Sequence, residues 1–247
     1  MSKASAFYLH TISAIALAAG CAPINTTPGS EVARTWEQGR VYLPHNSSYF
    51  RPSEVSVRDP RPTVVYLHGC TGITVGDQFW AGTLTEAGYA MVMPDSFARY
   101  HRLRNCDPRR YGTGLFPEAG RMRQEEIEHA LAMVRSSPWA DQKNLFLMGH
   151  SEGGAAVARW QGYSFKALII SGHWCRAGVR APLKTPIVAI NFESDPWSSG
   201  LSATCASRFQ IRENATELLL SGSGHDTSRS PEAQNAVMKF LLAQTTR

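Results

Sequence analysis

The chain has 247 residues, 43% of them hydrophobic and 18% charged, and a formal net charge of +5 at pH 7. This length suits one α/β domain with a sizeable core, since α/β folds of this size do not have to split into two domains. The positive charge is modest and comes with no dense basic helix and no base-stacking motif, so we expect no nucleic-acid partner.

Residues 1–20 are predicted to be an export signal of the lipoprotein type. Lys3 supplies a positive charge, and the mostly small, apolar stretch that follows is too short to span a bilayer comfortably. Gly20 directly before Cys21 resembles a bacterial lipobox, whose cysteine is lipidated and becomes the mature N-terminus. Ala18 stands where this motif favours leucine, so plain cleavage to a soluble periplasmic form is the alternative. We expect an exported protein of the bacterial periplasm, anchored to the membrane through a lipid on Cys21.

Residues 21–38 are predicted to be a flexible tether between this anchor and the folded domain. Residues 22 to about 38, exemplified by residues 22–30, are interpreted as rich in Pro, Thr, Ser and Gly, a composition typical of linkers. The folded α/β domain is expected to comprise residues 39–247.

Short apolar runs alternate with stretches of helical spacing through this domain. The predicted strands include residues 40–43, 54–57, 63–67, 145–148, 186–191 and 217–221. Apolar residues recur at helical spacing before Gly88 and before Pro138, and a last helix is predicted to start at Pro231 with Ser230 as its N-cap. Strands and helices that alternate in this way predict a doubly wound sheet.

A long connection, residues 97–121, interrupts this alternation and holds a cluster of arginines that includes Arg99, Arg102 and Arg109. Long loops in compact domains are often functional. The segment either caps a binding site and favours an acidic acyl group, or is a solvated excursion pinned by Cys106.

Residues 144–154 carry the most informative motif of the chain, an apolar run that ends in Gly-His-Ser-Glu-Gly at residues 149–153. A strand, a G-x-S-x-G turn and a helix in this order are typical of serine hydrolases, because the sharp turn forces the serine outward and tolerates only small neighbours. Ser151 is therefore the predicted nucleophile. His150, one residue away on the tight turn, points elsewhere and is interpreted as structural or pocket-lining.

A serine nucleophile needs a base, and the base needs a carboxylate; in this type of fold they follow the serine in the order acid, then histidine. Asp195 and His225 each follow a predicted buried strand. We therefore expect Ser151, Asp195 and His225 to form a catalytic triad. Glu193 is the alternative acid, and Asp195 could instead only start a turn with Pro196.

The tetrahedral intermediate of acyl transfer carries an oxyanion that needs hydrogen-bond donors. One donor is expected from the backbone N–H of Glu152, the residue after the serine, and the other from the loop after the strand at residues 63–67. That loop begins with His68, Gly69 and Cys70, and the N–H of Cys70 is the predicted second donor.

Together these motifs resemble the α/β-hydrolase superfamily, and within it the dienelactone hydrolase-related branch. The residues that carry the resemblance are 66–72, 87–90, 94–97, 149–153 and 193–197, with His225. It covers roughly residues 60–243 and implies an eight-stranded, mostly parallel sheet flanked by helices on both faces, with Ser151, Asp195 and His225 as the triad. Dienelactone hydrolases use a cysteine nucleophile where this chain has Ser151, which favours a general ester hydrolase over a dienelactone hydrolase.

Besides Cys21 the chain has four cysteines, an even number that favours disulfides in an exported protein. Counting alone allows three pairings. The positions relative to the predicted strands favour Cys70 with Cys106 and Cys175 with Cys205, and buried free thiols are the alternative. No zinc-binding spacing is present, so we expect no metal and no other cofactor.

The sequence as a whole predicts an exported serine hydrolase that cleaves small-molecule carboxylic esters, lactones or thioesters through an acyl-enzyme. Two alternatives remain open: a catalytically silent α/β-hydrolase scaffold that acts as an envelope binding protein, and a serine peptidase that uses the same triad. The natural substrate and the oligomeric state do not follow from the residues.

Overall fold

The computed structural model describes residues 27, 29–102, 106–109, 112–113, 117–198, 204–209 and 212–246. The predicted export signal and the predicted lipidation site Cys21 lie outside these residues. Within the described part of the chain, no helix is both long and apolar enough to cross a membrane.

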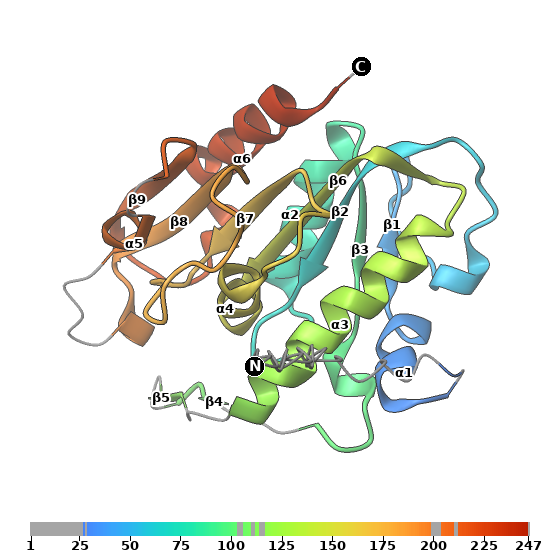
Figure 1. Cartoon of the computed structure of the whole chain (residues 1–247), viewed down its shortest axis with the longest axis horizontal. Helices are drawn as coiled ribbons and strands as arrows, with labels where there is room; N and C mark the ends of the chain where they lie inside the picture. The colour runs from blue at the N-terminus through green and yellow to red at the C-terminus, as the bar shows by residue number, and fades with distance from the viewer. Residues whose placement is uncertain are drawn as a thin grey trace, which may run out of the picture.

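A seven-stranded sheet forms the centre of the domain (Figure 1). The strands lie in the order β1-β3-β2-β6-β7-β8-β9, and all neighbours are parallel except β1 and β3. Their bounds are β1 (Arg40–Tyr42), β2 (Arg61–Leu67), β3 (Ala90–Met93), β6 (Ala140–His150), β7 (Ala167–Ser171), β8 (Ile187–Ser194) and β9 (Ala215–Ser223). A separate antiparallel hairpin joins β4 (Cys106–Asp107) and β5 (Gly112–Thr113).

The sheet has seven strands among the described residues where eight were predicted, because residues 54–57 do not join it. The chain makes a single bridge between Phe50 and Val41 and then enters a 3₁₀ turn, η1 (Pro52–Glu54). The residues after this turn run along the surface, and Val57 is 43% exposed. Val55 packs partly against the core, whereas residues 56–57 are exposed, so the segment is not buried as a strand of the sheet. The α/β class and the mostly parallel pairing are as predicted.

Helices cover both faces of this sheet. Helices α1 (Glu31–Glu37), α3 (Pro117–Arg135) and α4 (Glu152–Arg159) pack on one face, and α2 (Val75–Glu86) and α6 (Pro231–Gln244) pack on the other (Figure 1). A short helix, α5 (Ala206–Phe209), precedes β9.

The core has two halves that the sheet separates. Along β2, Val65 and Leu67 belong to the half under α3 and α4, whereas Val64 and Tyr66 belong to the half under α2 and α6. This division follows from the period of two along a strand. Burial on both faces explains why the central strands read as continuous apolar runs in the sequence.

Helix α1 lies within residues 21–38, the predicted flexible tether. The Ser30 hydroxyl caps its first turn, and Trp36 is buried in the core. Nε of Arg34 donates a hydrogen bond of 2.9 Å to the segment after β3. Residues 31–37 are therefore helical and packed rather than a flexible tether, because the Pro-rich composition ends at Ser30 and a capped, half-apolar turn follows it.

The carboxyl ends of the parallel strands meet at one edge of the sheet. Strands β6 and β8 each end directly before a predicted site residue, Ser151 and Asp195, and β9 ends shortly before His225. Strand β2 ends directly before His68, the start of the predicted oxyanion loop. In an open α/β sheet this edge is where ligands bind. The topology therefore brings the loops after β2, β6, β8 and β9 together at the carboxyl edge of the sheet.

Candidate active site

Ser151 lies on a sharp turn between β6 and α4. Its backbone has φ 56° and ψ −113°, a conformation that residues with side chains rarely adopt. A Cβ added at Gly149 would lie 2.4 Å from the backbone of Gly153, and one added at Gly153 would lie 2.0 Å from the carbonyl oxygen of Leu67. Because backbone atoms lie this close to both positions, only glycine fits at residues 149 and 153, on either side of the serine.

Asp195 and His225 are hydrogen-bonded to each other. Nδ1 of His225 donates to Oδ2 of Asp195 at 2.8 Å. The other carboxylate oxygen, Oδ1, accepts from the backbone N–H of Trp197 at 2.8 Å, within the 3₁₀ turn η3 (Pro196–Ser198). Asp195 is 4% exposed, whereas Glu193, the alternative acid, is exposed. One oxygen of Asp195 starts the turn and the other contacts the imidazole, so the turn does not compete with the contact to His225. The role of Asp195 as the catalytic acid stays a prediction.

Two cavities border Ser151 and His225. The larger has a volume of about 580 Å³ and the smaller about 340 Å³, and Cys70 and Trp197 also line both. Among the described residues, Nε2 of His225 has no hydrogen-bond partner. The ring of Trp197 lies against the imidazole, with ring centroids 5.3 Å apart. Ser151 and His225 therefore line the same two cavities, and Nε2 of the imidazole is buried without a partner beside them.

Two further histidines beside the site are neutral at pH 7. Burial, followed by the charge of His225, lowers the pKa of His150 to about 3, and the two rings lie 4.8 Å apart. Burial, followed by the charges of Arg159 and Arg176, lowers the pKa of His173 to about 4. His150 lines the smaller cavity and His173 the larger, as expected of a pocket-lining role for His150.

The backbone N–H groups of Glu152 and Cys70 donate to no acceptor among the described residues. Both residues border the larger cavity, although they come from separate segments, the start of α4 and the loop after β2. Unpaired N–H groups at a cavity wall can receive a negatively charged oxygen. Their role as an oxyanion hole stays a prediction.

The structure holds two disulfides in the pairing that the sequence favoured. Cys70 is bonded to Cys106 and Cys175 to Cys205, with Cα–Cα distances of 6.0 and 5.0 Å. The first bond links the loop after β2 to the hairpin of β4 and β5. One wall of the site is therefore tied covalently to the long connection at residues 97–121.

Arginines that the sequence did not single out also line the larger cavity. Among the described residues they are Arg123, Arg159, Arg176 and Arg180. They come from α3, from the end of α4 and from the loop after β7. Nothing in their local sequence distinguishes them from surface arginines, so no sequence signal could have found them.

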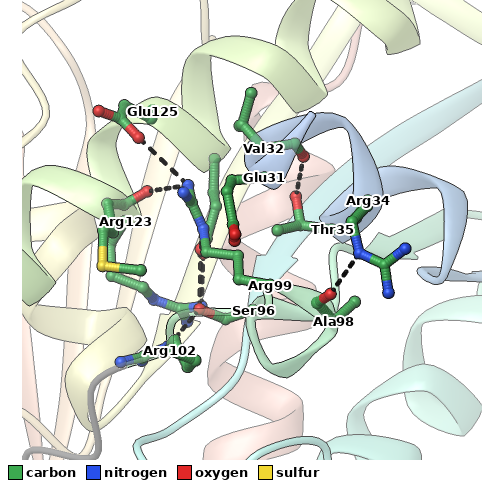
Figure 2. Close-up of polar contacts among 12 residues, drawn as sticks. Glu31, Val32, Arg34, Thr35, Ser96, Ala98, Arg99, Arg102, Arg123 and Glu125 are labelled. Atoms are coloured by element: carbon green, nitrogen blue, oxygen red, sulfur yellow. Dashed lines mark hydrogen bonds and ion pairs between the residues drawn. The ribbon is translucent and has the colours of Figure 1, made fainter. Parts of the chain in front are cut away.

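The arginines at the start of the long connection are paired with carboxylates. Nε of Arg99 donates to Oε1 of Glu126 at 2.9 Å, and Arg102 forms an ion pair with Glu152. Figure 2 shows Arg99 and Arg102 on either side of Ser96. The side chains of Arg99 and Arg102 are therefore packed against α3 and α4 and neutralised there, whereas Tyr100 and His101 between them are exposed to solvent.

We found no family model and no curated protein that matches this chain. Several solved structures resemble it. Est1E from Butyrivibrio proteoclasticus with bound ferulic acid has a TM-score of 0.57 at 15% identity, over 83% of this chain and 94% of that one. P91, a dienelactone hydrolase-like promiscuous phosphotriesterase from metagenomic libraries, has a TM-score of 0.57 at 13% identity, over 83% and 92%. The esterase domain of a Rhodothermus marinus protein has a TM-score of 0.54 at 17% identity, over 83% and 90%.

These likenesses and the mostly parallel sheet together show that the chain has the α/β-hydrolase fold. At such low identities the likeness is one of fold. The chemistry therefore has to be argued from the site itself.

Proposed function

We propose that this chain is a serine hydrolase that cleaves carboxylic esters, lactones or thioesters. The observation that carries the proposal is the bond between His225 and Asp195, which leaves Nε2 of the imidazole unpartnered at the two cavities that Ser151 also borders. An imidazole that a buried carboxylate orients is equipped to take the proton of a serine hydroxyl. The esterase structures that share the fold support esters as the substrate class.

In the first half-reaction, Oγ of Ser151 attacks the ester carbonyl carbon while Nε2 of His225 takes the hydroxyl proton. The carbonyl oxygen becomes an oxyanion, and the N–H groups of Glu152 and Cys70 stabilise it. Asp195 holds the ring and stabilises the imidazolium. The imidazolium then gives its proton to the leaving oxygen as the C–O bond breaks, and the acyl group stays on the serine.

In the second half-reaction, a water molecule enters where the alcohol has left. His225 takes one proton from this water, and the resulting hydroxide attacks the acyl carbon. The same two N–H groups stabilise the second oxyanion. The bond to Oγ of Ser151 then breaks, the serine recovers its proton from the imidazolium, and the carboxylic acid leaves. Two cavities beside one serine suit the acyl and alcohol parts of an ester.

The test compares the wild type with Ser151→Ala on p-nitrophenyl esters of increasing acyl length. We expect the wild type to hydrolyse part of this panel and to react with a fluorophosphonate probe. Ser151→Ala is expected to lose the labelling and to lower kcat by roughly 10⁴-fold or more. Activity retained in Ser151→Ala would refute the proposal.

The same assays separate the alternatives. A folded wild type that neither reacts with the probe nor hydrolyses any ester would indicate a silent binding protein. Hydrolysis of peptide substrates without hydrolysis of esters would indicate a serine peptidase.

We also propose that the chain is exported and anchored through a lipid on Cys21. Two disulfides support an oxidising compartment. In bacterial cells, Cys21→Ser is expected to move the protein from the detergent phase to the aqueous phase. The mass of the mature N-terminus should correspond to lipidated Cys21, and an unmodified N-terminus at any other residue would contradict the proposal.

A further inference from the structure

Arg123, on helix α3, is a buried cation next to the proposed active site. Its side chain is among the largest that are fully buried, and it lies at the wall of the larger cavity. Burial of a guanidinium is costly unless carboxylates and hydrogen-bond acceptors surround it. The groups that Arg123 contacts therefore indicate what it does.

The guanidinium of Arg123 contacts three segments. Nη1 donates to Oε2 of Glu126 at 2.7 Å, on the same helix. Nη2 donates to the carbonyl oxygen of His68, directly after β2. Nε makes no hydrogen bond among the described residues, but it forms an ion pair with Oε1 of Glu152, the first residue of α4, at 3.5 Å. The last two contacts reach the two segments that carry the proposed oxyanion donors.

These two segments, residues 68–70 and 151–153, are called the oxyanion segments below. They are packed directly against each other, since a Cβ added at Gly153 would lie 2.9 Å from the carbonyl oxygen that accepts from Arg123. Two N–H groups from separate segments can stabilise one oxyanion only when each is held about 2.7–3.1 Å from it. A rigid link between the oxyanion segments is therefore needed.

His68 fixes the first oxyanion segment within the same network. Its Nε2 accepts from the backbone N–H of Ser96 at 3.0 Å, so Nδ1 carries the ring proton and donates to the carbonyl oxygen of Gly69 at 2.7 Å. Burial, followed by the charge of Arg123, holds the pKa of His68 well below its usual value, which keeps this neutral form. Both ring nitrogens of His68 are thus hydrogen-bonded to backbone groups, and these bonds hold the turn that leads to Cys70.

We propose that Arg123 is a positioning residue that holds the N–H groups of Cys70 and Glu152 at the separation needed to bind one oxyanion. The inference rests on the proposed ester hydrolysis and adds to it a residue that acts on the two donors through the backbone of His68 and the carboxylate of Glu152. An ester carbonyl carries less charge on its oxygen than the transition state does. If the two N–H groups are no longer positioned correctly, the activation free energy of acyl transfer should rise more than the binding of the ester weakens.

Arg99 provides a matched control. It is 7% exposed, and its Nε donates to Oε1 of Glu126, the carboxylate that also pairs with Arg123. It further contacts Glu125, as Figure 2 shows, at 3.3 Å. Among the described residues it contacts neither oxyanion segment. Its replacement removes a buried cation from the same carboxylate and leaves the link between the segments in place.

The experiment compares Arg123→Gln, Arg123→Lys and Arg99→Gln with the wild type in three measurements. These are kcat and KM on an ester that the wild type hydrolyses, the Kd of phenylboronic acid, and unfolding in urea. Phenylboronic acid forms a reversible tetrahedral adduct with a serine oxygen, so its affinity reports on the oxyanion donors.

For Arg123→Gln we expect kcat to fall by about 10²- to 10³-fold, with KM within about threefold and a parallel loss of boronate affinity. If Arg123→Gln does not fold, Arg123→Lys supplies the test. Its single ammonium keeps the charge near Glu126 but cannot reach both oxyanion segments, and kcat should fall by at least about tenfold. Arg99→Gln should lose stability and keep kcat within about threefold.

The inference is overturned if the folded Arg123 variants keep kcat and boronate affinity within about threefold of the wild type. It is also overturned if Arg99→Gln loses both to the same degree, because the effect would then follow from the lost ion pair alone. Absence of ester hydrolysis and of probe labelling in the wild type would instead refute the proposed function.

Discussion

At the scale of single residues, Asp195 performs two tasks with one carboxyl group. One oxygen accepts from the backbone of the following turn, and the other accepts from the imidazole of His225. Both oxygens of this buried side chain are occupied. Glu193, only two residues earlier, is exposed, so the two positions contrast a buried carboxylate bound to the imidazole with a surface carboxylate.

Asp195→Asn is expected to lower kcat by roughly 10³- to 10⁴-fold, because an amide in place of Oδ2 favours the wrong tautomer of His225. Glu193→Gln should change kcat by no more than about twofold. Steady-state kinetics on one ester tests both variants. A reversed pattern, with Glu193→Gln inactive and Asp195→Asn near normal, would move the role of the acid to Glu193.

Four arginines, of which Arg159 is one, give the larger cavity an excess of positive charge. Glu152 is the acidic side chain among the described residues that line this cavity, and it already pairs with Arg102 and Arg123. Gly120 of helix α3 leaves room for the guanidinium of Arg159, because a Cβ at this position would lie 2.9 Å from Nη1 of Arg159. We therefore expect the cavity to favour an ester whose nearby part carries a carboxylate.

Arg159→Gln is expected to lower kcat/KM for a carboxylate-bearing ester about tenfold relative to a neutral ester of equal length, mainly through KM. The measurement is the ratio of the two kcat/KM values, at low and high salt. Arg135→Gln, at the exposed end of α3, is the control and should leave the ratio unchanged. An equal ratio in Arg159→Gln and the wild type would contradict the prediction.

At the scale of secondary-structure elements, α1 fastens the N-terminal part of the domain to the segment beside the site. Trp36 joins the core, and a carboxylate oxygen of Glu31 accepts from the backbone N–H of Tyr100 at 2.9 Å. The guanidinium of Arg34 lies 3.9 Å from the centroid of the Tyr100 ring. Helix α1 is therefore part of the folded domain and contributes to its stability.

Trp36→Ala is expected to lower the free energy of unfolding by about 3–5 kcal/mol, because it removes a large buried aromatic ring and leaves a cavity under α1. Val57→Ala, at an exposed position, should change it by no more than about 0.5 kcal/mol. Urea unfolding monitors both. A loss of less than about 1 kcal/mol in Trp36→Ala would indicate that α1 is only loosely attached.

At the scale of the whole molecule, several histidines are buried in the neutral form. Burial is the first cause that lowers the pKa of His68, His150 and His173, to about 3 for His150 and about 4 for His173. In the unfolded chain these groups titrate near about 6.5. Below that pH the unfolded chain binds more protons than the folded protein, so acid favours unfolding.

The free energy of unfolding is expected to fall as the pH is lowered from about 6.5 towards about 4, by up to about 1.4 kcal/mol per pH unit for each such histidine. The stabilising contribution is fully present above about pH 6.5. Urea unfolding at a series of pH values measures the slope, and His173→Gln should make it shallower.

The sequence by itself determined the features that depend on neighbouring residues. Strands buried on both faces read as apolar runs, and the close backbone contacts around Ser151 require the glycines of its motif. Because parallel strands end at one edge, the order of the loops predicted that Ser151, Asp195 and His225 would lie together. The structure brings Asp195 and His225 into contact, and the catalytic roles stay predictions until the variants are measured.

Only the tertiary structure decided which charged residues are paired and which face the cavity. Arg123 contacts the backbone of His68, 55 positions away, and Arg99 and Arg102 pair with carboxylates on other elements. Likewise, residues 31–37 became a packed helix and residues 54–57 stayed outside the sheet. Burial and ion pairing depend on neighbours in space, and a local pattern of residues does not encode which distant groups will supply them.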